Sequence, residues 1–391
     1  MEWLKQYQLF QAHSVVNYMQ CIWIERFKPI TLHRIKKYLT TKQVFTNYKI
    51  IRLLMKKLYT AFALCLLISV IASCSKKDEI GNVSFVTDFP ISIQLAGNEV
   101  DFDSVSGIPG AVNMNGENFL FFQYESDNLI METDSAFVPQ RYIFPKGQGP
   151  NEMLAASSVF GEIMGHDAIG AYDPYSCKIV TIQKDGSDYS TYQFEEQLRK
   201  AYAPRSTHQL KTGEFASLRG LNQFGMVSHD SCGLNIKEWE IGIDATDDIL
   251  LNNIILSGRS MSYNENRGIV AETYGALPYI ILHNEDGTIQ RIICVGPEID
   301  YGEIDTTNPQ KQINSVRMTD NYIYALGYEN DKEAPSVIYV IDYDGNGVAR
   351  LMADDTYSFC IDTKRRRIIT VNPNIEIPVK VYSIPDKIKN P

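Results

Sequence analysis

One stretch of the sequence has the spacing of a calcium loop. Asp342, Asp344 and Asn346 alternate with other residues and are followed by Gly347, which matches the D-x-[DN]-x-[DN]-G opening of such loops. A complete loop also needs a bidentate carboxylate at its twelfth position, where this chain has Ala353. The stretch also contains an Asp-Gly pair, which is typical of a tight hairpin because glycine readily adopts positive φ. The sequence therefore favours a hairpin turn over a calcium site here.

No other stretch has the spacing of a catalytic or cofactor site. After residue 73 the sequence has four histidines, none of them paired at metal-ligand spacing: His166, His208, His229 and His283. The sequence contains no Cys-x-x-Cys, no His-Glu-x-x-His and no Gly-x-Ser-x-Gly. The segment 147–149 opens a dinucleotide-binding pattern, G-x-G-x-x-G, that the following residues do not complete. We therefore expect no nucleotide cofactor.

A repeat of short strands runs from about residue 115 onward, with no helical period. Each unit has an apolar run, a turn and a second apolar run, and several units contain an Asp-Gly turn. Six positions are equivalent in this pattern: Phe119, Ile169, Phe215, Ile269, Tyr322 and Arg367. The steps between them are 50, 46, 54, 53 and 45 residues, and regular periods of this size with several strands each indicate a β-propeller.

The sequence therefore predicts an all-β fold, a six-bladed β-propeller, over residues 91–391. Closing the ring leaves few free strand edges, and we expect the early strand 91–95 to pair into the last blade and lock the ring. A pair of packed two-sheet sandwiches is the alternative, since irregular strand spacing can imitate a repeat.

The segment 146–153, Lys-Gly-Gln-Gly-Pro-Asn-Glu-Met, is followed by Phe160-Gly161. It resembles the G-x-G-P-x-E-[FM] signature of the six-bladed, TolB-like or NHL-like propeller lipoproteins of the Bacteroidetes. The resemblance implies this fold and an envelope location, and it implies no particular activity. The glycines allow a sharp turn that Pro150 ends, so we expect Asn151 and Glu152 to begin the next inner strand near the channel mouth. The alternative is a connection between blades that binds no ligand.

A secretory signal is predicted immediately before Cys74. Two lysines follow Met55, the run Leu58–Ile71 is almost wholly apolar, and small residues precede Cys74. The apolar run is short for a membrane span. The sequence Ile-Ala-Ser-Cys resembles the lipobox of bacterial lipoproteins, which implies that Cys74 is lipidated through its sulfur and becomes the new N-terminus. An ordinary buried cysteine at the end of a core helix is the alternative.

The tag after Cys74 and the segment before the signal complete the predicted organisation. Residues 75–79, Ser-Lys-Lys-Asp-Glu, resemble the charged tag that directs Bacteroidetes lipoproteins to the outer face of the outer membrane. The resemblance implies a lipid-anchored outer-membrane protein at the cell surface. The periplasmic face of that membrane, or a simple solvated linker, is the alternative.

The basic segment 1–54 precedes the signal, although a signal peptide should lead the chain. We therefore predict that Met55 is the true start and that residues 1–54 are a non-native upstream extension. A basic cytosolic segment with a single membrane anchor is the alternative. The predicted parts are the extension 1–54, the signal peptide 55–73, a lipid-anchored linker 74–90 and the propeller 91–391.

The charge distribution excludes some partners. The formal net charge of the chain is -10, and its first 73 residues contain eleven basic but only two acidic side chains. The predicted mature chain is therefore strongly acidic, which argues against nucleic acid as a partner. Four cysteines follow Cys74 in or beside apolar stretches, which favours buried free thiols over disulfides: Cys177, Cys232, Cys294 and Cys360.

We expect a binding module for a ligand or a protein, with the membrane contacted through the N-terminal lipid. A ligand would enter the channel mouth formed by the connections between blades. The predicted ligand-binding residues are polar residues in or next to those connections: Gln148, Asn151, Glu152, Arg205 and Arg219. Tyr-rich loops are compatible with a glycan partner because tyrosine rings stack on sugars, but tyrosine is also common in strands and on wet surfaces. An envelope protein is the other candidate partner. The basic run 364–367 is interpreted as a solvated hairpin tip.

An enzyme is the alternative to a binding module. Propeller hydrolases and lactonases, which the predicted fold resembles, hold a central calcium between Glu, Asn and Asp side chains of several blades. A calcium-dependent hydrolase or lyase would use calcium as its cofactor, and six residues could converge as ligands: Asn151, Glu152, Asn222, Glu272, Asn314 and Asp320.

Overall fold

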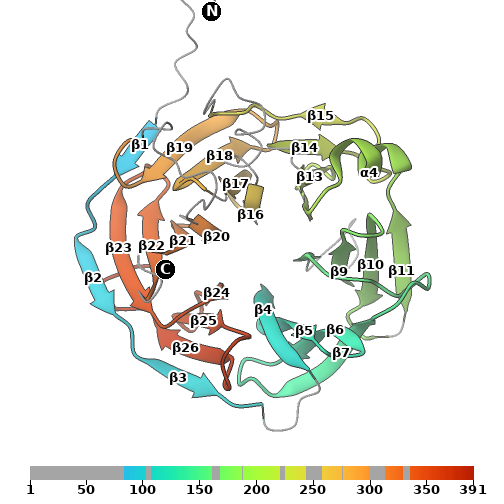
Figure 1. Cartoon of the computed structure of the whole chain (residues 1–391), viewed down its shortest axis with the longest axis horizontal. Helices are drawn as coiled ribbons and strands as arrows, with labels where there is room; N and C mark the ends of the chain where they lie inside the picture. Colours follow the sequence, from blue (N-terminus) through green and yellow to red (C-terminus); the bar gives the residue numbers. More distant parts are fainter. Residues whose placement is uncertain are drawn as a thin grey trace, which may run out of the picture. The chain divides into compact units, whose positions relative to one another are not determined.

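Six sheets follow one another around a ring in the computed structural model (Figure 1). This arrangement confirms the six-bladed, all-β propeller that the sequence repeat predicts. The structure describes these residues: 83–102, 107–160, 168–186, 188–220, 225–243, 258–274, 276–299, 313–328 and 335–391. The ring belongs to the unit Asp78–Pro391. Cys74, the predicted signal peptide and residues 1–54 lie outside the described residues, and the predicted linker 74–90 contains the first strand of the ring, β1 (Val83–Val86).

Each blade runs from an innermost strand at the channel to an outer strand at the rim. Blades 1 and 2 consist of β4 (Ile108–Asn115), β5 (Asn118–Tyr124), β6 (Asn128–Thr133) and β7 (Pro139–Pro145), then β8 (Ser158–Phe160), β9 (Ala168–Asp173), β10 (Lys178–Gln183) and β11 (Tyr189–Gln193). The helix α4 (Glu196–Tyr202) leads into blade 3. Blades 3 and 4 consist of β12 (Ser206–Gln209), β13 (Phe215–Leu218), β14 (Met226–His229) and β15 (Lys237–Glu238), then β16 (Gly258–Asn264), β17 (Ile269–Tyr274), β18 (Tyr279–Asn284) and β19 (Ile289–Val295). Blades 5 and 6 consist of β20 (Ile313–Met318), β21 (Tyr322–Tyr328), β22 (Ser336–Asp342) and β23 (Gly347–Ala353), then β24 (Ser358–Asp362), β25 (Arg367–Val371) and β26 (Val379–Ser383).

Three N-terminal strands lie along the outside of the last three blades, where Figure 1 shows them in blue. β1 pairs in parallel with β19 of blade 4, β2 (Ile91–Gln94) pairs in parallel with β23 of blade 5, and β3 (Gly97–Val100) pairs antiparallel with β26 of blade 6. The prediction that strand 91–95 closes the last blade is therefore wrong, because the following strand does so. Only a residue without a side chain fits at Gly97, since a Cβ there would lie 2.6 Å from the Tyr382 ring.

The Asp-Gly turns join the third and fourth strands of their blades. Gly186, Gly287 and Gly345 have φ values of 79°, 83° and 82°, a region that glycine adopts without strain. In the calcium-like stretch, Asp342 Oδ1 accepts hydrogen bonds from the backbone N–H of Asp344 (3.0 Å) and Asn346 (2.8 Å). The hairpin interpretation of this stretch is confirmed, because the Asp342 carboxylate closes the turn itself.

The hydrophobic core lies between neighbouring blades. The second strands β9 and β17 are buried along their whole length, because each blade packs its two faces against the blades beside it. This explains why the sequence shows continuous apolar runs at these strands and not a strict alternation. Of the four described cysteines, Cys177, Cys294 and Cys360 are buried free thiols, as predicted, whereas the free thiol of Cys232 is exposed. In the described part of the chain, no helix is long and apolar enough to span a membrane.

Candidate binding site in the central channel

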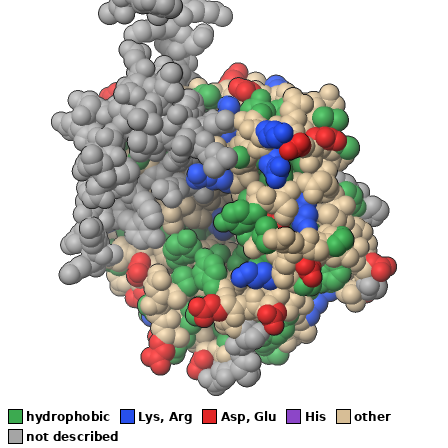
Figure 2. Space-filling model, turned by 45° about the vertical axis from the view of Figure 1, so that its right-hand side comes forward, with side chains coloured by type: hydrophobic (Ala, Val, Ile, Leu, Met, Phe, Trp, Pro, Cys, Tyr) green, Lys and Arg blue, Asp and Glu red, His purple; other side chains and the backbone are tan. Residues whose placement is uncertain are grey.

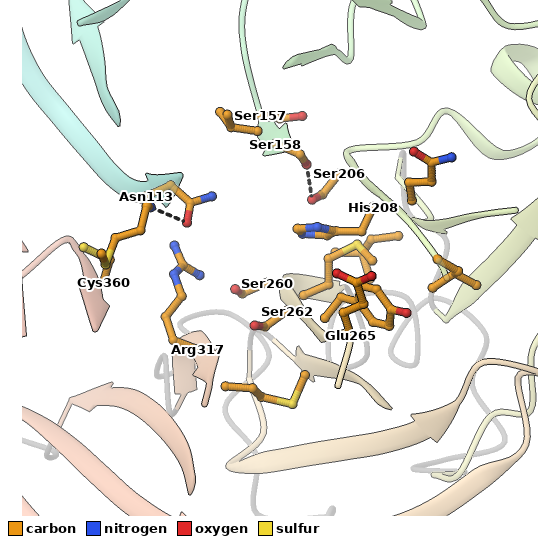
Figure 3. Close-up of a pocket in the computed structure, with 18 of the residues that line it drawn as sticks. Asn113, Ser157, Ser158, Ser206, His208, Ser260, Ser262, Glu265, Arg317 and Cys360 are labelled. Atoms are coloured by element: carbon orange, nitrogen blue, oxygen red, sulfur yellow. Dashed lines mark hydrogen bonds between the residues drawn. The ribbon is translucent and has the colours of Figure 1, made fainter. Parts of the chain in front are cut away.

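A cavity of about 1110 Å³ occupies the centre of the ring. The innermost strand of every blade contributes to its wall, so that strands from six distant parts of the sequence meet around one space (Figures 1 and 3). Strand side chains alternate between the two faces, and inward-facing positions therefore recur at every second residue. The polar side chains in the wall are Asn113, Ser157, Ser158, Arg205, Ser206, His208, Gln209, Lys211, Ser231, Ser260, Ser262, Tyr263, Glu265 and Arg317.

A serine stands on five of the innermost strands, opposite one of the last three residues of the paired strand. These residues are Ser158, Ser206, Ser260, Ser315 and Ser358. Three of them link neighbouring blades in the same way. The Ser158 hydroxyl oxygen accepts a hydrogen bond from Thr207 N–H (3.1 Å), that of Ser260 from Val316 N–H (3.3 Å), and that of Ser358 from Val112 N–H (3.3 Å).

Two residues further along each strand, the side chains differ from blade to blade. In blades 3, 4, 5 and 6 these positions hold His208, Ser262, Arg317 and Cys360. Blade 1 has Ala111 in place of the serine and Asn113 two residues later, and Asn113 and the other four side chains all line the cavity. Figure 3 shows them converging on the middle of the channel from different strands. The serines are therefore a shared structural feature of the ring, and the second set gives this channel its own chemistry.

Arg317 brings a positive charge into the channel. Its Nη1 donates to the backbone oxygen of Val316 (2.8 Å) and to the hydroxyl of Ser315 (3.3 Å), and its guanidinium lies 5.7 Å from the centre of the Phe359 ring. Its Nε is buried and has no hydrogen-bond partner among the described residues. No carboxylate in the described ranges forms an ion pair with it, and burial lowers the pKa of the guanidinium. Arginine nevertheless remains protonated in proteins, so a cation whose counter-ion is not among the described residues faces this space.

The wall near Arg317 is rich in hydrogen-bond donors. Asn113 Oδ1 accepts from the backbone N–H of Met114 (3.0 Å), which leaves the amide NH₂ to donate elsewhere. Ser260 accepts a backbone N–H group as described above, so its hydroxyl retains its own proton for donation. Such a set of donors fits an oxyanion, whose oxygens can accept several hydrogen bonds at once.

His208 lies at the same level of the channel, on the innermost strand of blade 3. Burial and the nearby charge of Arg317 lower the pKa of this imidazole to about 4. His208 is therefore neutral near pH 7. Cys360 also faces the cavity, but burial raises the pKa of its thiol. The thiol is protonated near neutral pH and lacks the thiolate character of a reactive cysteine.

Two histidines inside the blades have polar partners but no access to the channel. Ser217 Oγ and His229 Nε2 are 2.8 Å apart, as in a serine nucleophile with its base. Both residues are at most 1% exposed, so the pair stabilises blade 3 from within. In blade 4, Glu272 Oε1 accepts hydrogen bonds from Tyr274 (2.7 Å) and His283 (3.2 Å), again at fully buried positions.

The segment 146–153 is a self-contained connection between blades 1 and 2. Glu152 Oε2 accepts the Gly149 N–H (2.8 Å), and a Cβ on Gly147 would lie 2.1 Å from that same oxygen. The buried Lys178 on β10 donates to the backbone oxygens of Gly149 (3.1 Å) and Pro150 (3.5 Å). The glycines are therefore required by the close approach of the Glu152 carboxylate.

The structure separates the five residues predicted to bind a ligand. Arg205 lines the cavity. Asn151 Oδ1 instead accepts from the Thr191 hydroxyl (3.3 Å) on the outer strand β11, and Gln148 is exposed. The prediction that Asn151 and Glu152 begin the inner strand near the channel mouth is wrong, because that strand, β8, begins at residue 158.

Arg219 lies outside the cavity wall, on the far side of blade 3. Its Nη1 is 3.5 Å from Glu238 Oε2 on the outermost strand, and its guanidinium stacks 5.0 Å from the centre of the Tyr202 ring. The basic run 364–367 is also paired and is not a free tip: Arg365 binds Glu117 of blade 1 (2.7 Å) and Arg367 binds Asp362 (2.7 Å).

The five described members of the six candidate calcium ligands do not form one site. Asn222 lies outside the described residues. Asp320 accepts from Asn266, and Asn314 donates to the backbone oxygen of Tyr357 (3.4 Å), while Glu152 and Glu272 have the partners given above. The described residues contain no group of three metal-ligating side chains. Calcium prefers six to eight oxygen ligands including carboxylates, and a wall with Arg317 at its centre does not fit that requirement.

No protein-family model matches the sequence, and no curated protein matches it. Among solved structures, a protein of Bacteroides fragilis described as exported is 13% identical, with a TM-score of 0.51 over 77% of this chain and 99% of that chain. A member of the DUF4221 family from Bacteroides vulgatus is 11% identical, with a TM-score of 0.50 over 75% of this chain and 96% of that chain. Regucalcin of Agrobacterium tumefaciens, a calcium-binding protein, is 10% identical, with a TM-score of 0.48 over 76% of this chain and 96% of that chain. Identities this low show the shared fold alone.

The sequence analysis did not identify the channel wall. Serines recur at 158, 206, 260, 315 and 358, with steps of 48, 54, 55 and 43 residues. This period matches that of the apolar runs, and it marks the innermost strands. Aligning the short Ser-x-x segments with each other would have shown Arg317 and His208 at equivalent positions.

Proposed function

We propose that this chain is an exported, lipid-anchored propeller that binds a small oxyanion in its central channel. The observation that carries the proposal is Arg317, a cation with a buried, unpartnered Nε and no carboxylate partner in the described ranges. Of the charged side chains in the described wall, Arg205, Lys211 and Arg317 are basic and only Glu265 is acidic. A basic channel in an acidic chain attracts anions into the ring. Figure 2 shows several Lys and Arg side chains near the hollow of one face, with many Asp and Glu side chains toward its edge.

The proposed ligand is an oxyanion group, either free or carried on a glycan. Carboxylate, sulfate and phosphate groups all offer the planar or tetrahedral oxygens that an arginine and several hydroxyl donors can bind. A uronic acid or a sulfated sugar combines such a group with the glycan that the sequence names as one candidate partner. An envelope protein remains the other candidate partner, and it would contact the outer surface and not the channel.

The proposed location is the outer membrane, with a lipid on Cys74 and the ring displayed at the cell surface or on the periplasmic face. The lipobox-like sequence before Cys74 supports it, as does the description of the Bacteroides fragilis neighbour as exported. Mass spectrometry of the N-terminus from the native host tests this directly. A diacylglyceryl group on Cys74 is expected, and an unmodified chain that retains residues 1–73 would contradict it.

The binding experiment compares the melting temperature of the purified protein with galacturonate, galactose, sulfate and chloride at equal ionic strength. A ligand at about 100 times its Kd stabilises the folded state by about 2.7 kcal/mol, which is readily seen as a shift. We expect galacturonate or sulfate to stabilise the wild type, and Arg317→Gln to remove that stabilisation. Arg199→Gln is the matched control, because it removes one positive charge from the exposed surface of α4.

Three other results would overturn the oxyanion proposal. The first is equal stabilisation by galactose and galacturonate, which would show binding of a neutral sugar. The second is stabilisation by sulfate that persists in Arg317→Gln, which would be a general salt effect. The third is stabilisation by calcium, reversed by chelator, with no response to any anion, which would favour the calcium-dependent hydrolase or lyase instead.

A further inference from the structure

The wall of the channel holds a second group that can become positive, and it lies close enough to Arg317 for the two to interact. We propose that His208 is the second binding residue of the oxyanion site and takes up a proton when an oxyanion binds between it and Arg317. The inference rests on the function proposed above and extends it: the preferred ligand is an oxyanion with two negative charges, such as a sulfate or phosphate group.

Position and burial support a shared role for the two residues. His208 on β12 and Arg317 on β20 occupy equivalent positions of their strands, two residues after Ser206 and Ser315. Figure 3 shows both side chains directed into the channel from different blades. A ligand that reaches Arg317 therefore lies beside an imidazole and not only beside hydroxyl groups.

The physical reason for proton uptake is charge balance. In the empty channel, burial and the charge of Arg317 hold the pKa of His208 near about 4. A bound dianion offsets the charge of Arg317 and adds a negative charge beside the ring, and both effects favour the imidazolium form. The proton comes from the solvent, so binding consumes one proton per ligand where the pH lies between the two pKa values of His208.

Proton uptake by His208 must be distinguished from proton uptake by the other ionisable groups around the cavity. They are Arg205, Lys211, Tyr263, Glu265, Arg317 and Cys360. Burial raises the pKa of both Tyr263 and Cys360, which keeps them neutral in acid. Glu265 is the acidic side chain of the described wall, so Glu265→Gln is the necessary control.

The test is calorimetric titration of the purified protein with sulfate, which keeps its two charges across the range from about pH 7.5 to about pH 5. Titrations in two buffers with different ionisation enthalpies count the protons taken up. We expect uptake approaching one proton per sulfate at the acid end, and a Kd that falls by up to about tenfold per pH unit below the pKa of His208 in the complex. In His208→Gln both effects should disappear while weaker, pH-independent binding remains. In Glu265→Gln and Arg199→Gln both effects should persist.

The outcomes distinguish this inference from the function on which it rests. Sulfate binding to wild type without proton uptake, or with a pH dependence that His208→Gln retains, contradicts the inference and leaves the oxyanion site intact. A pH dependence lost in Glu265→Gln assigns the proton to that carboxylate and also contradicts the inference. Absence of sulfate binding at every pH overturns both proposals. The proton count itself is measured on the wild-type protein and so does not depend on how well the variants fold, while the variants assign the proton to a residue.

Discussion

The connection 146–153 and the wall of the central channel are both rich in polar groups. In the connection these groups form hydrogen bonds within the chain, whereas in the channel some of them keep donors without a partner among the described residues. In the connection, the Glu152 carboxylate binds a backbone N–H of the same turn, and Lys178 binds two backbone oxygens of that turn. In the channel, Arg317 keeps a buried Nε without a partner in the described part of the chain. The Asn113 amide has one end bound to its own strand, which leaves the other available.

This difference separates a structural motif from a binding surface. Polar groups that are satisfied within the chain stabilise the fold, and adding a ligand there would first require breaking those bonds. Polar groups that are buried and unsatisfied cost free energy in the protein without ligand. A ligand of opposite charge that binds them offsets this cost. The conspicuous G-x-G-P-x-E stretch belongs to the first kind, and the less conspicuous channel wall belongs to the second.

The largest effect that should separate the two regions is a loss of stability in acid that originates in the channel. The pKa of His208 is about 4 in the folded protein, against an ordinary value of 6.5. The folded-state pKa is the lower one, so this stability is complete above about pH 6.5 and is lost as the pH falls toward about 4. The loss amounts to about 3 kcal/mol. Urea unfolding at several pH values measures it in the absence of added anions.

The variant His208→Gln isolates this contribution, because glutamine does not titrate. Its free energy of unfolding should fall less than that of the wild type over the same pH range. Identical acid profiles for the two proteins would show that His208 is not held neutral by its surroundings. The channel and the connection would then not differ in their electrostatic effect on stability.

An intermediate effect is expected in the connection itself. Lys178→Met keeps most of the apolar length of the side chain but loses the bonds to the backbone oxygens of Gly149 and Pro150. Because the ammonium group is buried and charged, we expect a loss of about 2 kcal/mol in the free energy of unfolding, with anion binding in the channel unchanged. Lys200→Met on the exposed face of α4 is the control and should change stability by less than about 0.5 kcal/mol. A Lys178→Met protein of full stability that no longer binds anions would contradict these roles, because the connection and not the channel would then bind the ligand.

The sequence predicted the ring well because the cause of the pattern is local. All six positions used to define the repeat fall in the second strands of the six blades, at Phe119 in β5 and Arg367 in β25 for example. These strands are buried on both faces, so they appear in the sequence as continuous apolar runs. The innermost strands face the channel with one side, so their apolar signal is weaker and they were not recognised.

The closing strand and the site could not be read from the same pattern. Residues 91–94 and 97–100 are both short strands before the first blade, and only the tertiary packing at Gly97 against Tyr382 shows which of them completes the ring. The site depends on single side chains such as Arg317 and His208, which no period emphasises and which meet only after the ring closes. Sequence reasoning therefore selected the motif with the most unusual composition, and of the five residues it named, only Arg205 lies in the cavity wall.

The smallest predicted effect tests the contrast within the channel wall itself, where Ser260 and Ser262 lie on one strand and both line the cavity. Ser260 Oγ accepts the Val316 N–H of the next blade (3.3 Å), whereas the Ser262 hydroxyl has no hydrogen bond within the described ranges. Ser260→Ala leaves a backbone donor without its partner and should lower the free energy of unfolding by about 1 kcal/mol. Ser262→Ala should change it by less than about 0.5 kcal/mol. Urea unfolding of the two variants measures the difference, and equal values would show that the serine positions do not link the blades.

If the stability difference is found, a loss of anion affinity in Ser262→Ala alone would identify Ser262 as a donor to the ligand, because its hydroxyl makes no hydrogen bond within the described part of the fold.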